Sequence, residues 1–235
     1  MSRIARIVVE GVPYHITQRG NGRQQVFFDA ADYQLYMDLL QRNATDAGLV
    51  IWGWCLMPNH VHVVAVPHRP HAMASALGRT HADYARHFNL RKRACGHVWQ
   101  ARYYSCPVEA AHLWQALAYV ERNPVRARMV EQAEHYVWSS ARARLAEDSS
   151  QLELTSWRTE YTAERWRQVL ATSVAEEAFG QTLQGASRRG RPLGGPDFAQ
   201  QLENVAGRTL RPRSVGRPRG SKRVEQDQLT LEMGA

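Results

Sequence analysis

Two histidines separated by one residue, His60 and His62, are the first residues whose types and spacing could do chemistry. They fall in an apolar stretch typical of a strand, where side chains alternate, so both imidazoles should face one side, about 6.6 Å apart. Val61 and Val63 should then face a core. Two imidazoles on one face can chelate a divalent cation. Ten histidines make such a spacing expected by chance, so an exposed or hydrogen-bonded pair remains the alternative.

The second candidate pair is Tyr119 and Asn123. The stretch 109–122 has the pattern of a helix, and residues four apart share a helix face. A tyrosine can act as a nucleophile, and an asparagine offers a neutral oxygen ligand. Because a tyrosine on a helix rich in Ala and Leu can equally belong to a core, the pair alone leaves both roles open.

Several polar side chains could bind DNA bases or phosphates. Arg19 and Asn21 follow the first predicted strand, Arg102 lies in a Trp-Gln-Ala-Arg-Tyr stretch, and Arg126 follows Asn123. Arginine suits phosphate, and neighbouring aromatic residues suit stacking on unpaired bases. The alternative for each is a solvated charge or a turn residue.

The elements that must position these residues follow from periodicity and from capping residues. Alternation and apolar runs predict strands, and stripes spaced by three or four predict helices. The expected strands are 12–19, 49–56, 60–66 and 98–105, and the expected helices are 30–47, 71–90 and 109–122. Asp29 should cap the first helix, Gly48 should end it, and Pro124 should stop the last.

This order of elements predicts an α+β fold of the split βαβ, or ferredoxin-like, type. Such a fold is an antiparallel sheet with helices on one face. The helix that carries Tyr119 comes after the fourth strand, so it must pack against this unit.

Beyond the expected domain at 1–145, we predict a helical, Trp-rich extension at 146–186 and a basic tail at 187–235. Residues 187–223 contain ten Lys and Arg against two Asp and Glu. We expect little packed structure from residue 187, because Gly, Pro and Arg dominate there. The repeated Gly-Arg-Pro elements could lay arginines into a minor groove, and the candidate contacts are Arg191, Arg217 and Arg219.

Composition excludes several classes of protein. The chain has 235 residues, of which 44% are hydrophobic, so it can bury a core and is not wholly disordered. Its longest apolar run is about ten residues, where a membrane helix needs about 20. Three cysteines without CxxC spacing argue against a disulfide framework, and with the absence of a signal peptide they favour the cytoplasm. A formal charge of +8 favours a polyanionic partner such as nucleic acid.

Five ordered sequence blocks resemble the single-tyrosine HUH transposases, and among them the REP-associated tyrosine transposases (RAYT). The similarity spans about residues 5–145. The blocks are Tyr-His-Ile-Thr-Gln-Arg-Gly-Asn at 14–21, Met-Pro-Asn-His-Val-His at 57–62, Trp-Gln-Ala-Arg-Tyr at 99–103, Tyr-Val-Glu-Arg-Asn-Pro-Val-Arg-Ala at 119–127 and Trp-Ser-Ser at 138–140.

The resemblance implies the HUH endonuclease fold, a bacterial, nucleoid-associated protein and, as the favoured oligomeric state, a monomer. His60, His62 and Asn123 would be the metal ligands and Tyr119 the nucleophile. The family cleaves single-stranded DNA and leaves a 5′-phosphotyrosine and a free 3′-OH, and RAYT proteins act on hairpin-forming REP repeats. Mixed nitrogen and oxygen ligands suit Mg²⁺ or Mn²⁺.

Three functions therefore compete. The leading one is a metal-dependent single-strand DNA nuclease and strand transferase that acts in transposition. The alternative is a domesticated relative that binds hairpin DNA with little or no cleavage. A third is a zinc hydrolase built on His60 and His62, which lacks an evident third strong ligand in the sequence.

Overall fold

The computed structural model describes residues 6–145, 161–171 and 176–210. Its strands are β1 (Tyr14–Arg19), β2 (Leu49–Met57), β3 (His60–Pro67) and β4 (Tyr104–Pro107). Its α-helices are α1 (Ala30–Ala47), α2 (Ala72–Lys92), α3 (Leu113–Glu121), α4 (Asn123–Arg126), α5 (Ser140–Leu145), α6 (Ala163–Ala171), α7 (Glu176–Arg189) and α8 (Pro196–Ala206). Short 3₁₀ turns occur at Asn21–Arg23, Ala110–His112 and Ala133–His135. Within these ranges, no helix is long and apolar enough to span a membrane.

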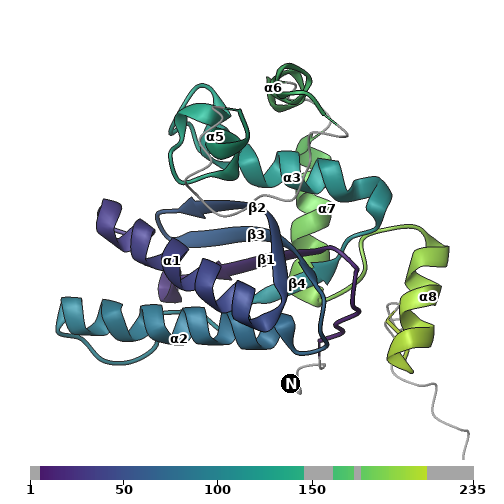
Figure 1. Cartoon of the computed structure of the whole chain (residues 1–235), viewed down its shortest axis with the longest axis horizontal. Coiled ribbons are helices and arrows are strands. Elements are labelled where there is room, and N and C mark those ends of the chain that lie inside the picture. The colour runs from purple at the N-terminus through teal and green to yellow at the C-terminus, as the bar shows by residue number, and fades with distance from the viewer. Residues whose placement is uncertain (1–5, 146–160, 172–175, 211–235) are drawn as a thin grey trace, which may run out of the picture.

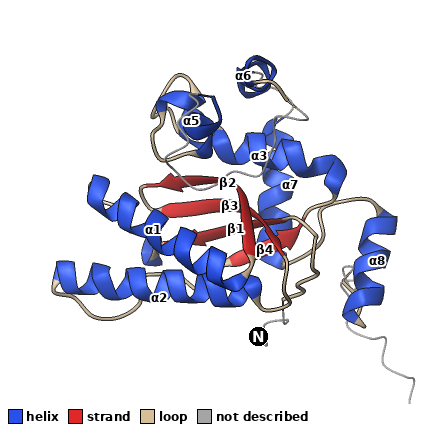
Figure 2. Cartoon of the chain, in the orientation of Figure 1, coloured by secondary structure: helices blue, strands red, loops and turns tan. Residues whose placement is uncertain are grey.

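The four strands form one sheet in the order β2-β3-β1-β4, and all neighbours are antiparallel. Figure 2 shows this sheet as a single layer between helices. This is the ferredoxin-like order, so the predicted α+β fold class is confirmed. Helices α1 and α2 lie on one side of the sheet, as expected, and α3 and α7 lie on the other (Figure 1).

The first helix has the ends that its sequence predicts. The Asp29 side chain accepts a hydrogen bond from the backbone N–H of Asp32, which satisfies one of the unpaired donors at a helix N-terminus. Gly48 ends the helix in the left-handed conformation, at a φ of 72°, which a side chain would disfavour. The helix therefore returns the chain directly into β2.

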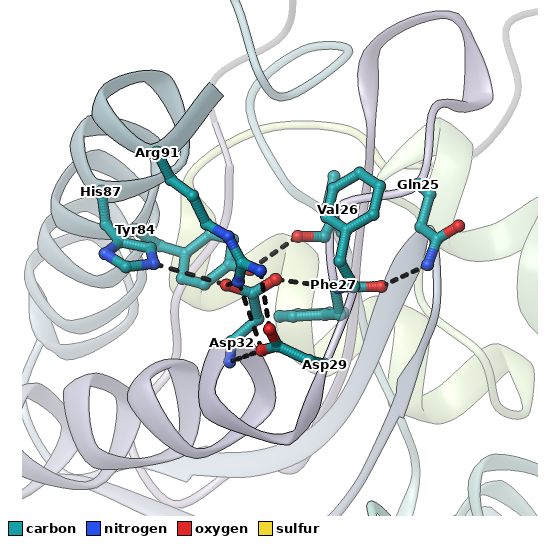
Figure 3. A network of polar contacts seen from close by, with 9 residues as sticks. Gln25, Val26, Phe27, Asp29, Asp32, Tyr84, His87 and Arg91 are labelled. Carbon is teal, nitrogen blue, oxygen red and sulfur yellow. Dashed lines mark hydrogen bonds and ion pairs between the residues drawn. The ribbon is translucent and has the colours of Figure 1, made fainter. Parts of the chain in front are cut away.

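An ionic clamp joins the start of α1 to the end of α2 (Figure 3). The Arg91 guanidinium donates to the carboxylates of Asp29 and Asp32, and His87 lies 3.4 Å from Asp32. The hydrogen bond from Arg91 lowers the pKa of Asp29 to about 2. The clamp fixes how the two helices lie across the same face of the sheet.

Alternation along β1 and β3 separates an apolar face from a polar one. Ile16, Val61 and Val63 are buried in the cluster beneath α1 and α2. His15 and His62 therefore point to the opposite face, toward α3 and α7. The predicted orientation of Val61 and Val63 toward a core is confirmed by this burial.

The predicted strand at 98–105 is mostly wrong, because β4 covers only Tyr104–Pro107. The preceding residues pack toward α2 instead: Val98, Trp99 and Tyr103 are buried, and the Trp99 indole donates to the carbonyl of His81. Trp99 keeps a single bridge to Gly20. Burial of aromatic rings therefore outweighs strand propensity in this segment.

The predicted helix at 109–122 is shorter in the structure, and Pro124 does not end the helical path. Helix α3 spans Leu113–Glu121, and Pro124 then sits in the first turn of α4. Proline is accepted there because the first N–H groups of a helix need no internal partner. The two helices place Tyr119 and Asn123 on neighbouring turns.

The expectation of little packed structure from residue 187 is wrong for residues 187–210. Ser187 is buried at the end of α7, Leu193 is buried against Val108, and α8 follows. The N–H of Gly195 donates to the Glu109 carboxylate, which fixes the start of α8. Residues 211–235 lie outside the described part of the chain, and the proposed division into domains remains a prediction.

The buried carboxylate of Glu121, at the end of α3, forms hydrogen bonds to side chains of α5 and α6. One oxygen accepts from Arg144 at 2.9 Å and from the Ser140 hydroxyl at 2.6 Å, and the other accepts from the Trp166 indole at 2.7 Å. Both charged side chains are nearly inaccessible to solvent. The pair thereby anchors α3 to α5 and α6.

Arg144→Met should lower the free energy of unfolding by about 3–5 kcal/mol, because it leaves the Glu121 carboxylate buried without its charged partner. Arg167→Met is the matched control, since Arg167 pairs with Glu134 at the surface and its loss should cost about 0–1 kcal/mol. Urea denaturation measures both. Equal losses would contradict a structural role for the buried pair.

Stability should also depend on pH through His81. Burial lowers its pKa to about 3, whereas an unfolded histidine titrates near 6.5. Below pH 6.5 the unfolded state therefore binds a proton that the folded state does not, so stability falls as pH drops toward 3, by about 1.4 kcal/mol per pH unit for this group.

His81→Phe should remove that contribution, leaving a shallower decline of stability between pH 6.5 and 4.5. Urea titrations at several pH values give the two slopes. An unchanged slope would show that His81 is protonated in the folded protein.

Candidate active site

The candidate site lies on the polar face of the sheet, where β1 and β3 run side by side. Their register places Thr17 opposite His62 and Arg19 opposite His60, so alternate side chains of both strands point to the same face. They open into a pocket of about 200 Å³. Its lining residues are Thr17, Arg19, His60, His62, Gln100, Tyr104, Asn123, Arg126, Gln184 and Arg188.

Each predicted histidine ligand has one ring nitrogen held by the protein. His60 Nδ1 lies 2.6 Å from Asn59 Oδ1, and His62 Nδ1 lies 2.9 Å from His15 Nε2. The Nε2 atoms are therefore the ring nitrogens that can bind a cation. Such contacts fix the orientation and tautomer of a ligating imidazole.

Both histidines are kept neutral. Burial, with a smaller effect of Arg19, lowers the pKa of His60 to about 3. Burial also lowers the pKa of His62, and its neighbours His60 and His15 add to the effect. Because a metal binds the neutral imidazole, these environments favour coordination at neutral pH.

A chain of hydrogen bonds continues behind His62. His15 is fully buried, and its Nδ1 lies 2.7 Å from the Ser187 hydroxyl, which itself lies 3.2 Å from Cys106 Sγ. Burial lowers the pKa of His15 to about 3. The consistent assignment has His62 donating to His15 and His15 donating to Ser187, so helix α7 takes part in orienting the predicted ligand.

Asn123 lines the pocket, and its amide nitrogen is held by the backbone of α3. Its Nδ2 donates to the carbonyls of Tyr119 and Val120, at 2.9 and 3.3 Å, so Oδ1 is the atom of this amide that can reach a cation. No group of three or more His, Cys, Asp or Glu side chains that could hold a metal occurs among the described residues. A cation here would be held by two imidazole nitrogens and an amide oxygen, a donor set that fits Mn²⁺ or Mg²⁺.

Tyr119 lies directly behind this pocket. Its ring meets those of His15 and His62 edge-on, with centroids 6.1 and 5.9 Å away, and the Arg126 guanidinium lies 4.7 Å from its centroid. The side chain is fully buried, and Tyr119 is not among the pocket-lining residues. The tyrosine and the histidines therefore belong to one cluster.

Helix α7 covers the tyrosine. Gln184 Nε2 donates to the Tyr119 hydroxyl, at 2.5 Å, and Gln184 itself lines the pocket. Gly180 lies against the ring, where an added Cβ would be 2.5 Å from Cε2. A glycine is thus required at this crossing, and the Tyr119 hydroxyl is hydrogen-bonded to a side chain that lines the pocket.

The predicted DNA-binding residues are divided between different places. Arg19 and Arg126 line the pocket, and burial lowers the pKa of Arg19. Asn21 and Arg102 line a second, larger groove. Arg191 lies just beyond α7, where its N–H donates to the Ala186 carbonyl. The remaining two, Arg217 and Arg219, lie outside the described residues.

Four residues of α7 contribute to the site without any signal in the sequence, namely Gly180, Gln184, Ser187 and Arg188. The stretch reads as an amphipathic helix, but its polar residues carry no motif and lie more than 60 positions after Tyr119. Only its packing against β4 and α3 brings it to the site. Gln100, which belongs to the sequence block at 99–103, also lines the pocket.

Comparison with solved structures agrees with the fold. A REP-associated tyrosine transposase bound to a REP hairpin matches at a TM-score of 0.50 and 19% identity, over 69% of this chain and 96% of that one. A protein from Deinococcus radiodurans R1, described as a transposase, matches at a TM-score of 0.36 and 23% identity, over 52% of this chain and 97% of that one. No curated protein matches the sequence.

The sequence of residues 8–123 matches the family described as "Transposase IS200 like". This range contains β1 to β4, both pocket histidines, Tyr119 and Asn123. The domain at residues 8–123, which carries the candidate site, is therefore of the IS200-like transposase kind.

Proposed function

We propose that this protein is a metal-dependent endonuclease and strand transferase for single-stranded DNA, acting on REP-like hairpins through Tyr119. The observation that carries the proposal is the convergence of His60, His62 and Asn123 on one pocket, directly in front of a buried tyrosine. The solved relative bound to a REP hairpin supports hairpin DNA as the substrate class.

The residues of the pocket suit a phosphodiester. Arg19, Arg126 and Arg188 line it and favour the charge of a phosphate. A divalent cation held by the two histidines and Asn123 would neutralise developing charge on the non-bridging oxygens as a Lewis acid. Burial of the site strengthens each of these interactions.

In the proposed step, the Tyr119 oxygen forms a bond to phosphorus while the bond from phosphorus to the 3′ oxygen breaks. The tyrosine hydroxyl gives up its proton and the 3′ oxygen takes one up, which yields a 5′-phosphotyrosine and a free 3′-OH. The phosphodiester linkage is conserved, so the reverse attack by a 3′-OH rejoins DNA without another source of energy. This suits strand transfer rather than degradation.

One observation favours the second candidate, a hairpin-binding protein with little cleavage. The Tyr119 hydroxyl is buried and accepts a hydrogen bond from Gln184, so attack on a phosphate requires this amide to move. Detection of a covalent protein–DNA complex distinguishes the two functions.

Tyr119→Phe should abolish the covalent complex with hairpin DNA in Mn²⁺, by about 1,000-fold or more, because only the nucleophilic oxygen is removed. DNA binding should be retained. Denaturing gel electrophoresis with labelled DNA measures the complex. Tyr104→Phe is the matched control, since Tyr104 also lines the pocket, and it should keep the complex. If the covalent complex forms in Tyr119→Phe but is lost in Tyr104→Phe, Tyr104 is the nucleophile instead.

His62→Ala should weaken Mn²⁺ binding at least about 10-fold and should abolish cleavage, as a chelator should. His15→Phe should weaken Mn²⁺ binding about 10-fold, because residues that orient a ligand commonly change affinity by about 10–100-fold. Calorimetric titration of the free protein measures the affinities, with the exposed His68→Ala as the control. Cleavage in excess chelator would contradict the metal-dependent mechanism.

A further inference from the structure

A second groove lies beside the pocket, between helix α2 and the segment 96–103. It has a volume of about 820 Å³, which is ample for a planar ring of nucleobase size. Gln100 lines both this groove and the pocket. The two hollows therefore adjoin each other at Gln100.

One wall of the groove is built from small residues of α2. Ala74, Gly78, Ala82 and Ala85 recur at intervals of three or four, so they share one helix face. A Cβ added at Gly78 would meet nothing within 4 Å. The wall is thus a flat, mainly apolar surface open to a planar group.

A buried polar atom requires a partner at this groove. The Gln18 side chain is 2% exposed, and its Nε2 donates to the Ala101 carbonyl at 2.8 Å. Its Oε1 is buried and has no hydrogen-bond partner among the described residues. Because an unsatisfied buried acceptor costs about 1–3 kcal/mol, a ligand that donates an N–H here would recover that cost.

The charge of the groove points to an anionic ligand. Arg6 and Arg102 line it, and no acidic side chain does so among the described residues. The Arg6 guanidinium stacks at 3.6 Å over the Tyr103 ring and donates to the Tyr103 carbonyl. The groove therefore combines cationic side chains, an apolar surface and one buried acceptor. These features complement the phosphate and the base of a nucleotide.

We propose that this groove binds one unpaired nucleobase of the DNA strand that occupies the pocket, with Gln18 Oε1 accepting an N–H from its Watson–Crick edge. Such an edge is free only outside a duplex, so the groove selects single-stranded DNA. The α2 face provides the surface on which the base lies, and the arginines bind its flanking phosphates. The inference rests on the proposed function and specifies where its substrate is held.

The test uses the full chain and a fluorescein-labelled DNA hairpin with single-stranded flanks of about ten nucleotides. A series of the same DNA carries one abasic site at successive flank positions. Fluorescence anisotropy should show one position at which loss of the base weakens binding about 5- to 100-fold, the range for loss of one stacked base.

Gly78→Leu should fill the groove, weaken binding of intact DNA by a similar factor and abolish the difference between intact and abasic DNA. The variant adds a side chain at an exposed helix position, so it should fold. Gln41→Leu, at an exposed position on α1, is the matched control and should retain both affinity and discrimination.

The outcomes separate the two proposals. If the protein binds the hairpin and forms the covalent complex, but no abasic position matters or Gly78→Leu has no effect, the groove proposal is overturned and the proposed function stands. If neither binding nor a covalent complex is seen with any of these DNAs, the proposed function fails and the groove proposal with it.

Discussion

The buried Glu121 carboxylate is the constraint on which the candidate site depends. A charge removed from water must be compensated inside the protein, and Glu121 obtains its partners from Ser140, Arg144 and Trp166. Arg144 also donates to the Trp52 carbonyl in β2. The end of α3 is thereby tied to the sheet and to two later helices. Tyr119 and Asn123 lie two residues on either side of this anchor, so it sets where both side chains can be.

On the polar face of the sheet, polar side chains of the site are buried away from solvent. His15 and His62 are buried beside Tyr119, and the low pKa of each histidine keeps it neutral there. Each then needs hydrogen bonds but no counter-charge. Helix α7 supplies one through Ser187 and covers the tyrosine with Gly180 and Gln184. The second face is therefore covered by a helix that follows the ferredoxin-like unit in the sequence.

The site and the groove share one physical basis, since both combine cationic side chains with the absence of a nearby carboxylate among their described lining residues. They differ in what they offer besides charge. The pocket offers imidazole nitrogens and an amide oxygen, which suit a metal and a phosphate. The groove offers a flat helix face and one buried acceptor, which suit a base. A nucleic acid strand carries both kinds of group at alternate positions.

Sequence periodicity determined most of the sheet and the first two helices. Alternation placed Val61 and Val63 toward the core and the histidines away from it, and the capping residues Asp29 and Gly48 set the limits of α1. These features depend on local geometry, which the order of residues encodes directly. The sequence blocks likewise singled out the histidines, Tyr119 and Asn123.

What only the tertiary structure decided depends on contacts between distant parts of the chain. The segment before β4 lies outside the sheet because burial of the Trp99 and Tyr103 rings against α2 is more stabilising than strand pairing. Gln184 and Ser187 reached the site because α7 packs on α3 and β4, which no local pattern specifies. The unsatisfied oxygen of Gln18 is likewise a property of its surroundings, since its own strand only places it on the apolar face.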